Sequence, residues 1–181
     1  QLIELNNKRK EIEQNIINEI DFEKIKKENT NVIIYYNKSI NEGLIGIIAS
    51  RLKDYFNKPS IVITSSNNIL KGSARSTLRY NIGNLIKQLV DNKIIENGGG
   101  HNMAAGFTIK KNNIQLLDEY IQKDYLNKIK THEIFYKYDS LLSTSAINNK
   151  FMDELNKLGP FGNSNFLPVF LIQKVKILNL T

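Results

Sequence analysis

Between residues 31 and 129, short apolar runs alternate with segments whose apolar residues recur every three to four positions. A short run bounded by turn residues is typical of a buried strand, and the longer recurrence is typical of a helix with one buried face. Their alternation along one chain predicts an α/β domain, with a mixed sheet flanked by helices. We expect strands at 31–37, 59–66, 69–76 and from 104 onward, and helices at 39–56, 81–90 and 113–129.

Local signals set the expected ends of these elements. Ser39 and Glu42 have the spacing of a capping box, which predicts that the first of these helices begins there. Asn81 is a good N-cap residue for the next helix. Two asparagines at 67–68 indicate a turn, so the strands on either side are expected to form a hairpin.

The first thirty residues are polar apart from one stripe at helical spacing. Such a stripe buries one face of a helix against a partner and leaves the rest in solvent. Its members are Leu5, Ile12, Ile16 and Ile20. We expect residues 1–30 to be a linker helix whose last part, 21–30, is polar chain.

The pattern changes after Thr131. Residues 132–142 and 167–178 alternate like strands, and a short helical segment with a Pro/Gly/Asn turn lies between them. We therefore expect residues 31–131 to form the α/β domain and residues 132–181 to begin a second, mostly β module. Because the chain starts with Gln1 and stops within an apolar alternating stretch, we also expect it to be part of a longer protein.

Composition narrows the partner classes. No apolar run is long enough to span a bilayer, and the absence of cysteine excludes disulfides and thiolate metal sites, which fits a cytoplasmic protein. The net charge of +7 suggests an anionic partner such as nucleic acid. Lys, Asn and Ile all have AT-rich codons, so a biased genome would give the same lysine excess. The four arginines are more informative, and they are Arg9, Arg51, Arg75 and Arg79.

One of the two histidines follows three consecutive glycines, in the stretch "GGGHNMAAGF". Glycines can adopt positive φ, and successive N–H groups in such a turn form a concave anion site. An imidazole beside that site adds a donor, so Gly99, Gly100 and His101 are candidates for a phosphate contact. Alternatively, the glycines only turn the chain. Ala104 to Gly106 are small enough for a ligand or another backbone to approach the next strand closely.

Two other segments carry similar signals. In "KGSARS", period-2 alternation puts Ser73 and Arg75 on one face of a strand, and a guanidinium beside a hydroxyl suits a phosphate. In "NEGLIGII", Gly43 and Gly46 are expected in the first turn of a helix, where glycine costs stability. Close approach of a ligand or helix–sheet packing would explain these two glycines equally well.

Taken together, "EGLIGIIASRL", "KGSARS" and "GGHNMAAGF" resemble the DHH-associated domain of the RecJ family of single-strand-specific 5′-to-3′ exonucleases. The later "LGPFGNSNFLPVF" resembles the beginning of the OB-fold that follows in that family. The opening helix resembles the end of the long helix that joins the catalytic DHH domain to the DHH-associated domain. The resemblance therefore covers nearly the whole chain.

The resemblance implies which residues contact nucleic-acid phosphate, near the 5′ end of the strand. The main candidates are Arg75, Ser76, Gly99, Gly100 and His101, followed by Asn102, with Ser73, Asn41 and Gly43 as secondary candidates. RecJ proteins usually have a histidine where Asn41 stands. Asparagine cannot ionise, so a charge-dependent role at that position is left open.

The resemblance also implies the activity. Hydrolysis in the family uses manganese or magnesium held by the DHH domain, and no Asp-His-His string occurs here. We therefore assign no catalytic residue and no metal ligand to this chain, and expect His132 at the surface. The expected role is to bind single-stranded DNA, in DNA repair and recombination, for a missing DHH domain that does the chemistry. The fragment alone should be inactive, and the whole protein a bacterial cytoplasmic monomer.

Three alternatives stay open at this point. The first is a DHH-family phosphodiesterase for short oligonucleotides or cyclic dinucleotides, although such enzymes usually lack the OB-like tail. The second is a non-catalytic nucleic-acid-binding module, and the apolar stripe of residues 1–20 weighs against it because the stripe needs a partner. The third is a docking domain whose glycines are purely structural.

Overall fold

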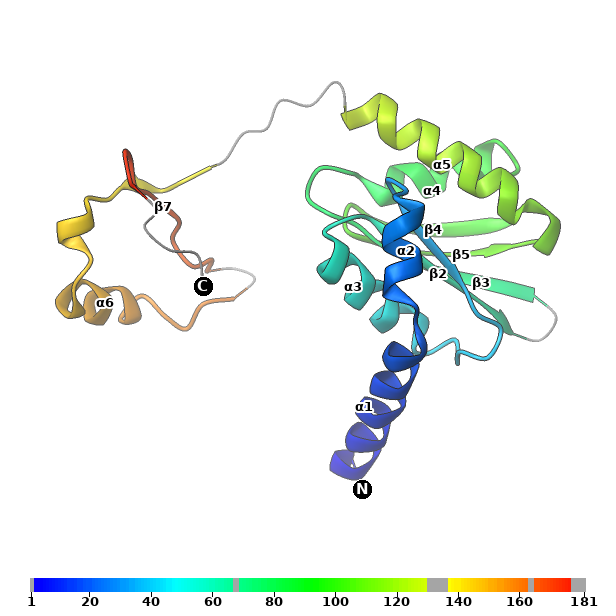
Figure 1. The fold of residues 1–181 in the computed structure, drawn as a ribbon, viewed down its shortest axis with the longest axis horizontal. Helices are drawn as coiled ribbons and strands as arrows, with labels where there is room; N and C mark the ends of the chain where they lie inside the picture. The colour runs from blue at the N-terminus through cyan, green and yellow to red at the C-terminus, as the bar shows by residue number, and fades with distance from the viewer. Residues whose placement is uncertain (1, 67–68, 130–136, 163–164, 177–181) are drawn as a thin grey trace. The chain divides into compact units, whose positions relative to one another are not determined.

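The computed structural model describes residues 2–66, 69–129, 137–162 and 165–176. The chain forms two compact units, Gln1–His132 and Glu133–Thr181 (Figure 1). The first contains a five-stranded sheet with helices on both faces. The second is small, and its described residues include one short α-helix, a 3-10 turn and one pair of short strands.

The sheet of the first unit is mixed, as the sequence predicts. Its spatial order is β1 (Ile33–Tyr36), β2 (Ser60–Ser66), β3 (Ile69–Arg75), β5 (Ala104–Ile109) and β4 (Asn97–His101). β1 and β2 run parallel, and every other neighbouring pair is antiparallel. The β2–β3 pair is the expected hairpin; its turn at 67–68 lies outside the described residues.

Helices cover the two faces unequally. α3 (Ile45–Phe56) packs on β2 and β3 from one side, where Ile48, Leu52 and Val62 are fully buried. α4 (Ile82–Asp91) and α5 (Ile114–Ile129) bury the opposite face in a larger core. Tertiary packing of an amphipathic face supplies most of the stability of such helices.

The first thirty residues form two helices, not one helix and a polar tail. α1 (Leu2–Glu19) is followed by α2 (Phe22–Glu28), whose N-cap is Asp21. The Asp21 carboxylate accepts a hydrogen bond from the Lys24 N–H at 2.8 Å, and this cap starts the new helix. Of the predicted apolar stripe, the C-terminal part packs against α3 through Ile16 and Ile20, and Leu5 is exposed.

One buried carboxylate holds α1 against α3. The Glu13 side chain is 8% exposed and pairs with Arg51 of α3 at 2.7 Å and with Arg9 of α1 at 3.2 Å. A buried carboxylate needs such partners because leaving its charge unpaired is costly. Two of the four arginines are therefore structural.

The predicted capping box at Ser39 and Glu42 is wrong. α3 begins at Ile45, because the chain makes two further turns after β1. The Ser39 N–H donates to the Asn37 side chain at 2.9 Å, and Glu42 forms an ion pair with Lys71 at 2.6 Å. The predicted cap of α4 is confirmed, since the Asn81 side chain accepts from the Asn84 N–H.

The glycine run is a strand, not a turn. Gly98 to Gly100 belong to β4, the edge strand that pairs with β5. No glycine in the described residues has a positive φ. The concave arrangement of N–H groups expected from this run is therefore absent from β4, and any ligand contact there must use an extended backbone.

In the described part of the second unit, the strands are shorter than the sequence predicts. A two-residue strand, β6 (Ser140–Leu141), pairs in parallel with β7 (Phe170–Leu171), and α6 (Asn149–Asn156) lies between them in the chain. The predicted segments 132–142 and 167–178 extend beyond the described residues at one end each, and His132 is outside them too. No helix in the described part of either unit is long and apolar enough to cross a membrane.

Candidate nucleic-acid interface

Strand register brings the candidate residues onto one face of the sheet. Arg75 of β3 pairs with Ala104 of β5, which pairs with His101 of β4. Two residues before Arg75 on β3, Ser73 is in register with Gly106 of β5, which pairs with Gly99 of β4. Directly opposite residues in antiparallel strands point to the same side, so both rows project together.

This face is uncovered beyond β3. α3 packs on β2 and β3, whereas all five residues of β4 are exposed, and so is Gly106 of β5. Neighbouring strands are about 4.8 Å apart, so Arg75 and His101 flank a strip about 10 Å wide. We call the strip formed by Ala104, Gly106, Gly99 and His101, with Ser73 and Arg75 along its edge, the open face.

Arg75 is oriented by its surroundings. Its Nη1 donates to the Ser73 hydroxyl at 3.2 Å and to the Ala74 carbonyl at 2.9 Å, which confirms that Ser73 and Arg75 share a face. A Cβ on Gly46 of α3 would lie 2.8 Å from Arg75 Nη2. Gly46 is therefore small so that the guanidinium fits beneath the helix. Nε and Nη2 donate no hydrogen bond within the described residues, so they are free for an anion.

The three consecutive glycines lack a side chain for different reasons. A Cβ on Gly98 would be 2.7 Å from Ile86 Cγ2 of α4, and one on Gly100 would be 2.4 Å from Ala105 Cβ. Both are excluded by packing within the protein. A Cβ on Gly99 would have no heavy atom within 4 Å, and the nearest one to a Cβ on Gly106 is 3.8 Å away. Internal packing therefore explains Gly98 and Gly100 but leaves Gly99 unexplained.

Two other candidates are used by the fold. Ser76 is 1% exposed, and its hydroxyl donates to the Tyr80 carbonyl, so it cannot reach a ligand on the open face. Asn102 accepts from the Asn81 side chain at 2.8 Å and, through its carbonyl, from the Ile82 N–H at 3.1 Å. These bonds fasten the β4–β5 turn to the start of α4.

The secondary candidates before α3 are exposed. Asn41 Oδ1 accepts from the Gly43 N–H at 2.8 Å and closes the turn that leads into the helix. Asn41 thus caps this turn and not α3 itself. Gly43 also lies in the turn, and not in the first helical turn as predicted; only Gly46 does.

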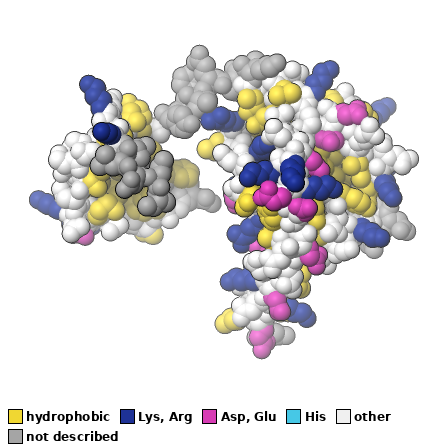
Figure 2. Space-filling view, in the orientation of Figure 1, with side chains coloured by type: hydrophobic (Ala, Val, Ile, Leu, Met, Phe, Trp, Pro, Cys, Tyr) yellow, Lys and Arg dark blue, Asp and Glu magenta, His cyan; other side chains and the backbone are white. Residues whose placement is uncertain are grey.

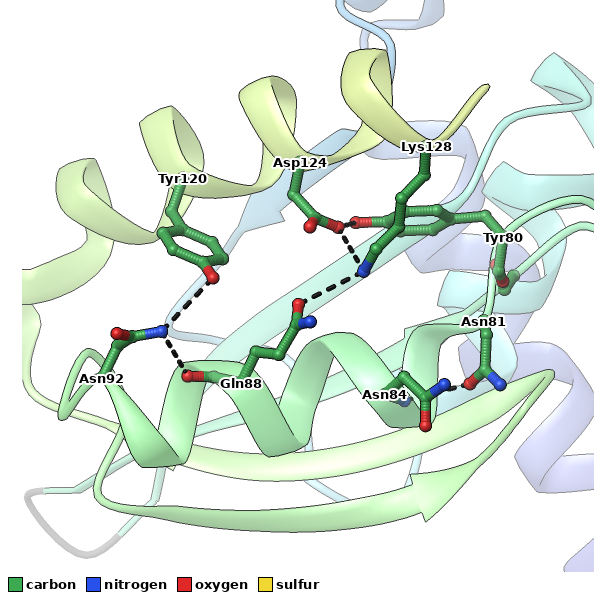
Figure 3. A network of polar contacts seen from close by, with 9 residues as sticks. Tyr80, Asn81, Asn84, Gln88, Asn92, Tyr120, Asp124 and Lys128 are labelled. Atoms are coloured by element: carbon green, nitrogen blue, oxygen red, sulfur yellow. Dashed lines mark hydrogen bonds and ion pairs between the residues drawn. The ribbon is translucent and has the colours of Figure 1, made fainter. Parts of the chain in front are cut away.

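A partly buried polar network supports the chain between β3 and α4 (Figure 3). The Tyr80 hydroxyl donates to Asp124 of α5 at 2.6 Å, and Lys128 pairs with Asp124 at 2.9 Å while donating to Gln88 of α4 at 3.2 Å. Burial, together with the Asp124 carboxylate, raises the pKa of Tyr80 well above its usual range, so the phenol stays protonated as a donor. The network fixes α5 to the segment that follows Arg75.

Charge alone does not locate the interface. In the view of Figure 2, Lys and Arg side chains are interspersed with acidic ones over α1 and α2. Alternating signs partly cancel at a distance, and exposed charges are screened beyond about 10 Å at 0.1 M salt. The open face is distinguished by the Arg75 guanidinium and by the missing side chains of Gly99 and Gly106.

The described residues do not fit a divalent-metal centre. They contain no group of three or more His, Cys, Asp or Glu side chains that could hold a metal ion. Manganese and magnesium prefer several oxygen ligands, and the main candidates on the open face offer none that is a carboxylate.

Sequence reasoning missed the next row of the same sheet face. Lys71 of β3 is in register with Thr108 of β5, which pairs with Asn97 of β4. Period-2 alternation back from Arg75 would have found Lys71. The other two become neighbours only through strand register, and Glu42 joins them through its ion pair with Lys71.

The sequence matches two family models. The first is the DHHA1 domain, over residues 29–125, and the second is the RecJ OB domain, over residues 138–181. The chain belongs to the RecJ family. This confirms the resemblance inferred from the motifs, and the two matched regions follow one another in the order that the RecJ resemblance implies.

Individual relatives agree. The single-stranded-DNA-specific exonuclease RecJ of Bacillus subtilis is 35% identical over 138 residues, which cover 74% of this chain and 17% of that protein. RecJ of Haemophilus influenzae is 28% identical over 180 residues, covering 93% of this chain and 31% of that protein. The chain thus spans less than a third of the length of these two relatives.

A solved structure shows the same fold. The crystal structure of RecJ in complex with Mn²⁺ from Thermus thermophilus matches with a TM-score of 0.69 and 21% identity, over 94% of this chain and 25% of that one. The α/β class with a mixed sheet flanked by helices is therefore confirmed as the fold of this part of RecJ.

Proposed function

We propose that this chain is the substrate-binding part of a 5′-to-3′ single-stranded-DNA exonuclease, and that its open face grips a phosphate near the 5′ end of the strand. Arg75 and His101 would contact the phosphate from two sides, and Gly99 would let the backbone of the strand lie close to β4. The observation that carries the proposal is that all three residues share one sheet face, which α3 covers at β3 and leaves uncovered beyond it.

The chemistry of these residues supports a phosphate. The free donors of Arg75 can form a charge-assisted pair with phosphate oxygens, and an exposed imidazole can donate one more hydrogen bond. This contact does not depend on the DNA sequence, because phosphate contacts position a nucleic acid and only base contacts distinguish one sequence from another. We place the hydrolytic step, with its manganese or magnesium, on a DHH domain outside these residues.

The biological setting of the whole protein is part of the proposal. We propose that the whole protein acts in DNA repair and recombination, as a cytoplasmic monomer, and that the 181-residue chain has no nuclease activity of its own. Incubation of the chain with labelled single strands and Mn²⁺ tests the last point. Shortening of the strand by the purified chain would refute it.

The binding experiment uses a fluorescent single-stranded DNA with a 5′ phosphate, titrated across a salt series. We expect Arg75→Ala with His101→Ala to weaken binding by about tenfold or more, because a hydrogen bond to a charged group contributes about 1.5–3 kcal/mol. For each phosphate that the variant no longer binds, the slope of log affinity against log salt should become shallower by about 0.7.

Lys123→Ala is the matched control. It removes one exposed positive charge from α5, which covers the other face of the sheet. We expect it to change affinity and slope far less than Arg75→Ala does. Equal effects of the two single variants would mean that binding reflects the general positive charge of the chain, and the open face would not be the interface.

A further inference from the structure

A groove continues the open face away from Arg75. It has a volume of about 380 Å³ and is bordered by Glu42 on the loop before α3, Lys71 on β3, and Asn97 and Thr108 on β4 and β5. Its floor includes Gly106, and Ile45 at the start of α3 forms part of its wall. The groove is shallow and open, so a ligand there would lie against the sheet and would not be enclosed by it.

The polar groups at this groove include both donors and acceptors. The Thr108 hydroxyl donates to Asn97 Oδ1 at 2.7 Å, and Lys71 donates to Glu42 Oε2 at 2.6 Å. The two N–H donors of the Asn97 amide make no hydrogen bond within the described residues. A carboxylate has about four acceptor positions, so Glu42 keeps acceptor capacity beyond its bonds to Lys71 and Ser66.

The charges at this end are balanced, because Lys71 and Glu42 form an ion pair, so this end has no net positive charge to attract a phosphate. Glu42 is 45% exposed, and the Lys71 ammonium and Ser66 hydroxyl hold its pKa below the usual range, so it is ionised at neutral pH. An anionic carboxylate repels a phosphate but accepts hydrogen bonds from neutral N–H groups. The floor at Gly106 has no side chain that would prevent a flat ring from lying on it.

Lys71 and Arg75 mark the two ends of this face on the same strand. Lys71 and Arg75 are four residues apart on β3, which at about 3.3 Å per residue is about 13 Å. A nucleotide whose phosphate contacts Arg75 can therefore extend its base along the sheet toward Lys71 and Asn97. Every nucleobase has at least one N–H donor and at least one acceptor on its edges, so each can hydrogen-bond to both Glu42 and Asn97.

We propose that this groove is a nucleobase subsite, which holds the base of a nucleotide whose phosphate is bound at the open face. Asn97 and Glu42 contact the edge of the base, and Gly106 supports its plane. The proposal rests on the proposed phosphate grip and extends it from the phosphate to the base. It adds Glu42 and Asn97 to the residues that we propose bind the DNA strand.

The test compares 5′-phosphorylated strands of equal length and charge that carry one abasic residue at the first, second or third nucleotide, or at the 3′ end as the control. We expect an abasic residue at one of the 5′ positions to weaken binding about tenfold, the loss expected for one hydrogen bond to a charged group. Asn97→Ala and Glu42→Gln should weaken the intact strand to a similar extent and leave the matching abasic strand unchanged.

Two results would overturn the subsite. One is equal affinity for the intact strand and all the abasic strands, and the other is an equal loss for intact and abasic strands in both variants. Arg75→Ala, measured on the abasic strand, separates this failure from failure of the phosphate grip. If Arg75→Ala still weakens that strand, the grip stands and only the base subsite is refuted.

Discussion

Packing excludes a side chain at Gly98 and Gly100 but not at Gly99, and this difference predicts how substitutions change stability and DNA binding. At Gly100, a methyl group would lie 2.4 Å from both the Ala104 carbonyl oxygen and Ala105 Cβ. Those neighbours are part of strand β5, so the backbone itself must move. We expect Gly100→Ala to destabilise the protein by about 1–3 kcal/mol, as overpacking of a well-packed site does.

Gly99→Ala should behave in the opposite way. Its methyl group would have no heavy atom within 4 Å, and its φ is not positive, so alanine fits without strain. Replacing such a glycine stabilises a protein by about 0.4–1 kcal/mol, because the unfolded chain loses freedom. Since 1 kcal/mol corresponds to about 2–4 °C for a chain of this size, Gly99→Ala should raise Tm by about 1–4 °C, whereas Gly100→Ala lowers it by about 2–12 °C.

The assay is thermal unfolding by circular dichroism, followed by titration with 5′-phosphorylated single-stranded DNA. If Gly99 is small for a ligand, Gly99→Val should weaken binding while the protein stays folded. A loss of stability in Gly99→Ala as large as that in Gly100→Ala would refute this difference and make the whole run structural. Unchanged binding by Gly99→Val would remove Gly99 from the interface.

Three further predictions concern the support of the site. Gly46→Ala should displace the Arg75 guanidinium and weaken DNA binding nearly as much as Arg75→Ala, and the double variant should be no weaker, as titration would show. Tyr80→Phe should lower the free energy of unfolding in urea by about 1–3 kcal/mol, because the partly buried Asp124 carboxylate loses a donor. An NMR titration should give a pKa below 4.5 for the Glu42 carboxyl. Because the pKa is lowered in the folded state, the ion pair with Lys71 stabilises the fold at neutral pH, and this contribution is lost as the pH falls through that pKa.

Much of the fold could be predicted from local pattern. Period-2 alternation gave the shared face of Ser73 and Arg75, and the asparagine at position 81 gave the start of α4, because both depend only on neighbouring residues. The capping-box prediction at Ser39 was wrong because it used only the spacing of residues close together in the sequence. The spacing was right, but Glu42 has a partner far away in the sequence, Lys71, that the pattern could not contain.

The site depended on information that no local pattern holds. A glycine run is compatible with a turn or a strand, and only pairing with β5 makes Gly99 part of an exposed edge. The same pairing brings His101 into register with Arg75, which is distant in sequence. Ser76 was a reasonable candidate by position, but burial turned its hydroxyl toward Tyr80.

The sequence by itself therefore determined the class of fold, the order of its elements and the family, because hydrophobic periodicity and short motifs are properties of neighbouring residues. Tertiary structure decided which of the motif residues can meet a ligand. The physical reason is that strand register and helix coverage are set by contacts between distant segments, and these contacts leave Gly99 and His101 exposed while they bury Ser76.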